Sequence, residues 1–233
     1  KIQKQDTMVK KLFTYLILPL AIAALAYLCV ASIMEPVNFN KEKAFREEIA
    51  IGRLKDIRTL QVAYKTENGK FTSDIDSLKN FYNNGKIKVV MQIGSKDDSL
   101  AVANTQRIQK RNPRIKPEQL FELYQKGEKL VFSIENMVPV KDTLFNNRLD
   151  FRIDSLAFIP FSGDSLIMDS AVKTVSGVKV PLFEACMPYR SLLKGLDNQL
   201  RINLDAERED TGRYPGLKVG SISAPNNNAG NWE

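Results

Sequence analysis

The sequence predicts an α+β protein in which an N-terminal transmembrane helix leads into a long amphipathic helix that packs on an antiparallel β-sheet. Residues 12–34 contain no charged residue, whereas the next segment, to about residue 67, has apolar residues at helical spacing. From Lys129 onward, short β-rich runs are separated by turn residues. A long helix followed by an antiparallel sheet with short helices is an α+β arrangement. A generic antiparallel sandwich with helical insertions is the alternative.

The apolar run 12–34 is predicted to be a transmembrane helix. At about 1.5 Å per residue it extends roughly 34 Å, which is enough for a bilayer core. A secretory signal peptide has only about 7–15 apolar residues before a small-x-small cleavage site. We therefore predict an uncleaved signal anchor, with a buried core helix as the alternative. Pro19 lies early in the span, where it either kinks the helix or is absorbed by the first turn.

The charges before the span predict its orientation. Residues 1–11 form a basic tail with Lys1, Lys4, Lys10 and Lys11 against Asp6. The positive-inside rule places this tail in the cytoplasm. Residues 35–223 are then an extracytoplasmic domain, periplasmic if the membrane is a bacterial inner membrane. The lipid bilayer is thus the first expected partner.

The segment after the span is predicted to start a new helix. Glu35-Pro36 ends the apolar run, Asn40 is a candidate N-cap, and Asn68-Gly69 is a strong stop signal. The apolar face of this helix consists of Phe45, Ile49, Leu54, Ile57, Leu60 and Tyr64. We interpret this face either as packing on the protein's own sheet or as a partner and assembly face for neighbouring subunits.

A short helix and a strand are predicted next. Ser73 and Asp76 resemble a capping box for a helix that ends near Tyr82. Asn83-Asn84-Gly85 is a turn, and residues 87–93 have the composition of a strand.

These elements together resemble a known family. The similarity spans residues 10–93 and is best over 53–64, Asn68-Gly69-Lys70-Phe71-Thr72 and 73–78. With the basic N-terminus and the hydrophobic helix, they are similar to type IV pilins and type II secretion pseudopilins. The resemblance implies a long helix packed on a sheet, followed by a turn and a short helix. Lys11-Leu12 replaces the glycine of the family's processing site, and Ile17 replaces its glutamate, the usual charge partner for adding subunits to a filament.

A second resemblance involves the C-terminal half. It is carried by residues 154–161, 177–185, 214–221 and 228–233. These segments resemble an uncharacterised family of single-pass envelope proteins of Bacteroidota. That similarity implies a compartment and a type of organism, and no mechanism.

Residues 94–128 are predicted to be an insertion with a polar helix over 97–110 and a second helix from Pro117 to a stop at Gly127. Its possible anionic-ligand patch consists of Arg107, Lys110, Arg111, Arg114 and Lys116. The candidate ligands are anionic headgroups, cell-wall polymer or an acidic partner, and an ordinary solvated surface is the alternative. Nucleic acid is not an expected partner, because the patch lies outside the cytoplasm and lacks interleaved aromatic residues.

The remainder is predicted to be mainly β. Ser176-Gly177 predicts a hairpin between flanking strands, and Pro160 and Pro181 indicate edge strands or strand ends. The other predicted strands are 130–134, 151–156, 158–161, 166–168, 200–204 and 217–222. One or two helical turns are expected over 191–196, and residues 224–233 are predicted to be a polar tail.

The composition argues against most enzyme classes. The chain has a net charge of +7 and contains no histidine. The absence of histidine excludes Ser-His-Asp and Cys-His catalysis. Its two cysteines cannot form a four-cysteine metal site, and we expect Cys186 to be a buried structural residue. The recurring Asp-Ser and Asp-Thr pairs are interpreted as turn and cap residues. We therefore expect no enzyme activity, no cofactor and no metal.

Three functional hypotheses follow. The first is a structural subunit of an envelope secretion or pilus-like assembly, which involves other envelope proteins and possible self-assembly. The second is an accessory or scaffold subunit of a larger membrane transport or translocon complex. The third is a protein that binds cell wall or another anionic polymer through the basic patch.

Overall fold

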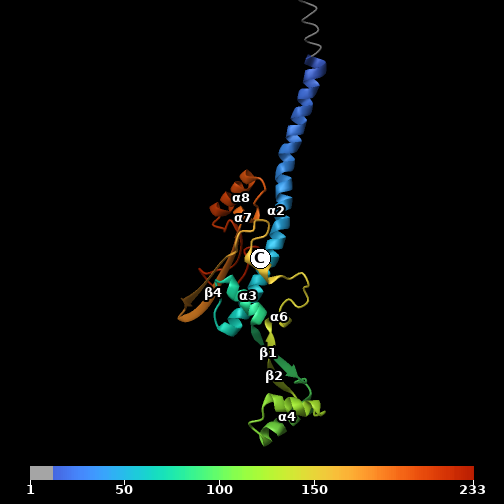
Figure 1. The fold of residues 1–233 in the computed structure, drawn as a ribbon, viewed down its shortest axis with the longest axis vertical. Coiled ribbons are helices and arrows are strands. Elements are labelled where there is room, and N and C mark those ends of the chain that lie inside the picture. The colour runs from blue at the N-terminus through green and yellow to red at the C-terminus, as the bar shows by residue number, and fades with distance from the viewer. Residues whose placement is uncertain (1–12) are drawn as a thin grey trace, which may run out of the picture.

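The computed structural model describes residues 13–233. The expected cytoplasmic tail over residues 1–11 therefore lies outside the described residues, as does Leu12. The molecule is elongated, with a long apolar helix at one end and a small hairpin domain at the other (Figure 1). The main α+β domain lies between them. The coarse α+β class is therefore confirmed.

One helix connects the predicted membrane span to the main domain. A π-helical turn, η1 (Phe13–Ile17), continues into α2 (Leu18–Asn68), which has 51 residues. Pro19 is absorbed in the first turn of α2, and Pro36 lies inside the helix without ending it. The predicted helix start at Asn40 is therefore wrong. A proline removes one backbone hydrogen bond, and the helix-forming residues on both sides of Pro36 outweigh that loss.

The end of α2 and the next helix follow local signals. The backbone of Gly69 adopts a left-handed conformation (φ 73°), and its N–H donates to the carbonyl of Lys65, which confirms the predicted stop. The helix α3 (Ile75–Asn84) confirms the predicted short helix. Its cap is Asp74 rather than Ser73, because the Asp74 carboxylate accepts the backbone N–H groups of Asp76 and Ser77.

The predicted insertion forms a small unit at the far end of the molecule. The antiparallel strands β1 (Lys86–Ile93) and β2 (Phe132–Pro139) form a two-stranded sheet, and between them lie α4 (Ser99–Arg111) and α5 (Pro117–Gln125). A separate core fills this unit. It consists of Leu120, Leu130, Phe132 and Ile134. A two-stranded hairpin is marginal alone, so we attribute its stability to packing of the two helices on it.

The second sheet has the strand order β3-β4-β5, formed by β3 (Ile167–Val175), β4 (Val178–Pro188) and β5 (Gly216–Gly220). The hairpin at Ser176-Gly177 is confirmed, and both residues have positive φ (51° and 83°). Pro181 lies in the central strand, yet β5 pairs only with Glu184–Pro188. Pro181 therefore lies where β4 has a single neighbour, which a residue without an N–H tolerates.

Two predicted strands are helical instead. Residues 151–156 overlap the 3-10 helix η2 (Ile153–Ala157), and residues 200–204 belong to α8 (Asn198–Asp210). In α8, Asp197 caps the N-terminus by accepting the backbone N–H of Leu200. Leu200 and Leu204, four residues apart, both pack on the main core. A five-residue alternation fits a strand, but the cap and this spacing favour a helix. Two short helices, α6 (Val140–Thr143) and α7 (Tyr189–Leu192), complete the fold.

The main core lies between α2, α3 and the three-stranded sheet. Its fully buried side chains include Leu54, Ile57, Leu60, Phe183 and Met187. Two arginines of α2 bind backbone carbonyls in or next to the short helices α7 (Tyr189–Leu192) and η2. Arg46 donates to the carbonyls of Leu192 and Lys194 (3.2 and 2.9 Å), and Arg53 donates to those of Ser155 and Phe158 (3.0 and 2.9 Å).

The polar C-terminal segment packs back on the domain. Gly230 forms a β-bridge with Val219, and the Asn231 side chain donates to the carbonyl of Gly216 at 2.9 Å. Arg58 of α2 pairs with Glu233 at 2.7 Å. The C-terminus thus lies beside α2 near the middle of the molecule (Figure 1).

Candidate functional site

The most exposed apolar surface is the N-terminal part of α2. Its most apolar stretch is not buried by any other part of the described chain, and within residues 13–233 this is the one helix long and apolar enough to cross a membrane. Leu20 and Tyr27, for example, are each 74% exposed. A helix that is apolar all round and unburied matches lipid rather than water.

The predicted assembly face is divided by the fold. Leu54, Ile57 and Leu60 are fully buried in the protein's own core. Tyr64 and Ile49 are half-buried, and the ring of Tyr64 makes an edge contact with Phe81 at 5.3 Å. Phe45 alone remains largely exposed, at 53%. Intramolecular packing therefore uses most of this face.

Phe45 belongs to an exposed surface that sequence reasoning did not find. Its ring lies 6.1 Å from that of Phe161, and the Arg46 guanidinium lies 4.7 Å from the same Phe161 ring. Phe45 and seven other residues of α2 between Ala31 and Arg46 line a hollow of about 960 Å³ together with Leu196-Asp197. We call this hollow the membrane-proximal groove. Its residues come from segments about 150 positions apart in the sequence, so no local pattern indicates it.

The five residues of the predicted anionic-ligand patch do gather in one place. They lie on the last turns of α4 and on the turn before α5, and all are exposed. A hollow of about 270 Å³ there is lined by Arg107, Ile108, Arg111, Asn112, Leu123 and Glu128. Lys110 and Arg111 occupy the last turn of α4, where the helix dipole favours cations. The patch is at the opposite end of the molecule from the apolar helix (Figure 1).

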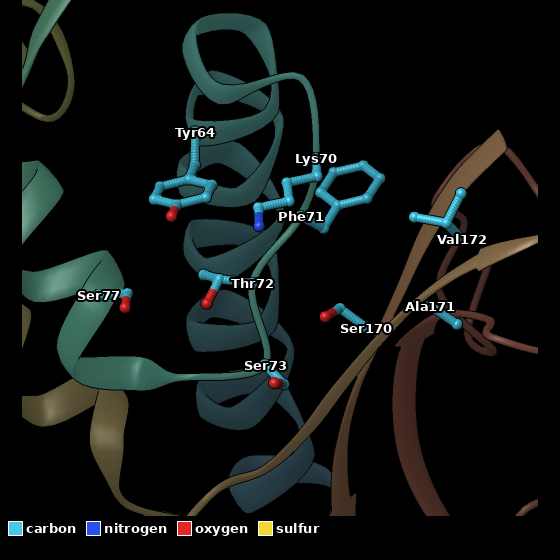
Figure 2. Close-up of a pocket in the computed structure, with 9 residues that line it drawn as sticks. All are labelled: Tyr64, Lys70, Phe71, Thr72, Ser73, Ser77, Ser170, Ala171 and Val172. Atoms are coloured by element: carbon cyan, nitrogen blue, oxygen red, sulfur yellow. The ribbon is translucent and has the colours of Figure 1, made fainter. Parts of the chain in front are cut away.

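A second small pocket lies between residues 70–73 and β3. Figure 2 shows Lys70 and the hydroxyl groups of Thr72, Ser73, Ser77 and Ser170 around it, and its volume is about 360 Å³. The buried side chain of Gln61 holds the backbone of Thr72, which lines this pocket. Its Nε2 donates to the carbonyl of Thr72 at 2.6 Å, and its Oε1 accepts the Thr72 N–H at 3.2 Å.

The chemistry of this pocket is structural. Ser77 donates its hydroxyl to the Asp74 carboxylate at 2.7 Å, and the same carboxylate accepts backbone N–H groups at the start of α3. These bonds, led by that from Ser77, lower the pKa of Asp74. A carboxylate with a lowered pKa is a poorer base, so this Ser-Asp pair caps a helix and does not activate a nucleophile.

Other residues that could act as nucleophiles, bases or ligands also have structural roles. Cys186 is buried, as expected, and burial with the nearby Glu184 raises the pKa of its thiol to about 12. Asp98 caps α4 by accepting the N–H groups of Leu100 and Ala101, which confirms the cap interpretation for this residue. In the described part of the chain, no group of three or more His, Cys, Asp or Glu residues is placed to hold a metal ion.

Comparison of the chain with protein-family models, with curated proteins and with solved structures finds no match.

Proposed function

We propose that the chain is a non-enzymatic, single-pass inner-membrane protein with its N-terminus in the cytoplasm and its α+β domain in the periplasm. In this proposal the domain is pilin-like and serves as a structural subunit of an envelope secretion or pilus-like assembly. The exposed apolar part of α2 lies in the bilayer, and the remainder of α2 forms the spine of the domain.

The observation that carries this proposal is the apolar surface of α2 beyond the predicted span. Val37 and Phe45 are 52% and 53% exposed, although both lie after Pro36 and therefore outside the apolar run. Phe45 lines the membrane-proximal groove, and Val37 lies on the same stretch of α2, next to Asn38 of the groove. Exposed apolar surface that continues from a membrane helix favours association with another helix. The proposed occupant is the same part of α2 from a second copy.

An accessory subunit of a larger membrane complex is the second candidate. It is favoured by the burial of Leu54, Ile57 and Leu60, because this burial removes most of the apolar face that neighbouring copies were expected to contact. In that case membrane proteins other than this chain cover the membrane-proximal groove.

Cysteine cross-linking in native membranes separates the two candidates. Cys186 is buried with a raised thiol pKa, so Cys29→Ser provides a background without a reactive native thiol. In that background we expect Val37→Cys to give disulfide-linked dimers on mild oxidation. Lys55→Cys, at an exposed position of α2 deeper in the domain, is the matched control and should stay monomeric.

Mass spectrometry after gentle-detergent purification completes the test. Val37→Cys dimers and multiple copies of the chain would support the structural subunit. Monomeric Val37→Cys with a fixed set of unlike membrane proteins would support the accessory subunit. A lone monomer in both measurements would contradict both candidates.

A further inference from the structure

The far end of the molecule carries positive charge that the fold does not use. Half of residues 107–116 are lysine or arginine and none is acidic. We call Arg107, Lys110, Arg111, Arg114 and Lys116 the basic tip. All five are exposed, and none is among the ion-paired cations of residues 13–233. Five like charges side by side repel one another, so a surface of this kind favours an anionic ligand.

The basic tip is rigidly held. Asn112 shapes the turn after α4, because its side-chain oxygen accepts the backbone N–H of Arg114 at 3.3 Å. Thr105 of α4 accepts the backbone N–H of Val131 at 2.9 Å, which fixes the helix beside β2. Ile108 and Ile115 pack against the separate core of this unit. The cationic side chains therefore project from a packed scaffold and not from a loose loop.

The position of the basic tip excludes one of the ligands considered from the sequence. With the proposed span, α2 after residue 34 rises about 50 Å from the bilayer, and the eight-residue strands β1 and β2 continue in the same direction for about 25 Å (Figure 1). Electrostatic attraction between exposed charges is largely screened beyond about 8 Å at physiological ionic strength. The headgroups of the protein's own membrane are therefore out of reach.

The shape of the surface favours a ligand with several charges. Arg107 and Arg111 are four residues apart on α4, so they share one face and border the same hollow. Glu128 also lines that hollow, and its negative charge offsets the charge of the two arginines. The hollow is therefore a weak site for one small anion. Lys110, Arg114 and Lys116 are not among its lining residues. A ligand must extend along the surface to contact all five cations.

The composition of the surface distinguishes a polymer from a protein partner. The centres of protein interfaces are enriched in aromatic residues and, apart from arginine, are depleted in charged residues. Between residues 107 and 116 the exposed side chains are charged or polar, apart from Pro113, and the two isoleucines are half-buried. Guanidinium groups bind carboxylates and phosphates through paired hydrogen bonds. We propose that the basic tip binds a linear polymer with repeating carboxylate or phosphate groups in the extracytoplasmic space. This inference rests on the membrane topology proposed above and does not depend on the subunit role.

The test uses the full chain in a neutral detergent, with immobilised alginate and inorganic polyphosphate as the two probes. The variant is Arg107→Glu/Lys110→Glu/Arg111→Glu. The matched control, Lys141→Glu/Lys179→Glu/Arg213→Glu, changes the net charge equally at dispersed positions that are exposed and outside the ion pairs of residues 13–233. We expect wild-type binding to at least one polymer, weakened at least tenfold by the tip variant and less than twofold by the control.

A milder variant guards against local unfolding. Glutamate at positions 110 and 111 opposes the dipole at the end of α4, so Arg107→Gln/Lys110→Gln/Arg111→Gln should also weaken binding while circular dichroism shows unchanged helix content. Preference for alginate identifies carboxylate groups, and preference for polyphosphate identifies phosphate groups.

Several results would overturn the proposal. They are absence of wild-type binding to both polymers, equal losses in the tip variant and the control, and full binding by the glutamine variant. Competition by phosphatidylglycerol vesicles at equal phosphate concentration would assign the tip to a lipid surface instead. Contact of the tip with an acidic protein, without polymer binding, would assign it to a protein partner.

Discussion

The ion pair between Asp56 and Arg148 provides the sharpest test of how α2 is held in its domain. Arg148 Nη1 donates to Asp56 Oδ1 at 2.6 Å and links the loop after α6 to α2. Asp56 is 7% exposed, whereas the Arg148 side chain is 45% exposed. The perturbation is Arg148→Met, which removes the charge and keeps much of the apolar stem.

The structure sets the size of the effect. Loss of a hydrogen bond to a charged group costs about 1.5–3 kcal/mol, and breaking a fully buried pair costs about 3–5 kcal/mol. Because Arg148 is half exposed, the lower range applies. Its guanidinium also lies 5.7 Å from the rings of Phe145 and Phe151, contacts that are worth about 0.5–1 kcal/mol at exposed sites. We expect a loss of about 2–3 kcal/mol in the free energy of unfolding at pH 7.

The loss should depend on pH. Burial raises the pKa of Asp56, and Arg148 opposes that rise. Without Arg148 the pKa rises further, so the folded state binds the proton more tightly than the unfolded state does. The penalty is then full above the raised folded pKa of Asp56. The electrostatic part of the penalty is lost as the pH falls through the raised pKa that Asp56 has beside Arg148, and the smaller contribution of the two ring contacts remains.

The assay is denaturant unfolding of the full chain in neutral detergent at several pH values. Trp232, the one tryptophan, packs against the main core and reports the transition. Lys141→Met serves as the exposed control, and Asp56→Asn combined with Arg148→Met should recover part of the loss at pH 7. Equal stabilities of Arg148→Met and wild type at pH 7, or a loss that is constant with pH, would refute the reasoning.

Three further predictions concern other parts of the domain. Gln61→Leu should lower the free energy of unfolding by about 2 kcal/mol in urea titrations, because the Thr72 N–H and carbonyl lose their partners; an unchanged midpoint would contradict this. Leu120→Ala should open residues 94–128 to limited proteolysis, through a cavity costing about 2–4 kcal/mol, and leave the Trp232 transition in place. A simultaneous shift of that transition would show that the two cores are coupled. Cys186 should resist maleimide at pH 8 until the chain is unfolded, as followed by mass spectrometry; labelling of the folded chain would argue against its burial.

The elements that could be predicted from the sequence are those with local signals. The stop of α2 at Gly69 depends on a left-handed backbone that glycine adopts easily. The hairpin at Ser176-Gly177 and the start of α5 at Pro117 depend on turn and cap chemistry within a few residues. The residues of the basic tip could be found for the same reason, since they are close together in the sequence.

The elements that could not be predicted depend on distant contacts. The five-residue alternation at 200–204 fits a strand, and its helical state depends on packing of Leu200 and Leu204 on the main core. The sequence identifies the apolar face of α2 but not what covers it. Burial of Leu54 and Ile57 depends on strands more than 100 residues away. The sequence does not indicate the membrane-proximal groove, because its two sides are also far apart in the sequence.

The continuity of α2 connects these observations. In the proposed topology, Pro36 lies just beyond the bilayer, and the carbonyl that its missing N–H leaves without a helical partner, that of Ser32, lies in the last turn of the span. Beyond it, Arg46 and Arg53 bind four backbone carbonyls in or next to α7 and η2, so the domain is fixed to the helix at two levels. A domain fixed in this way cannot swing freely about the membrane surface. The orientation of α2 in the bilayer therefore also sets the height and direction of the basic tip, and any partner that tilts α2 changes what the tip can reach.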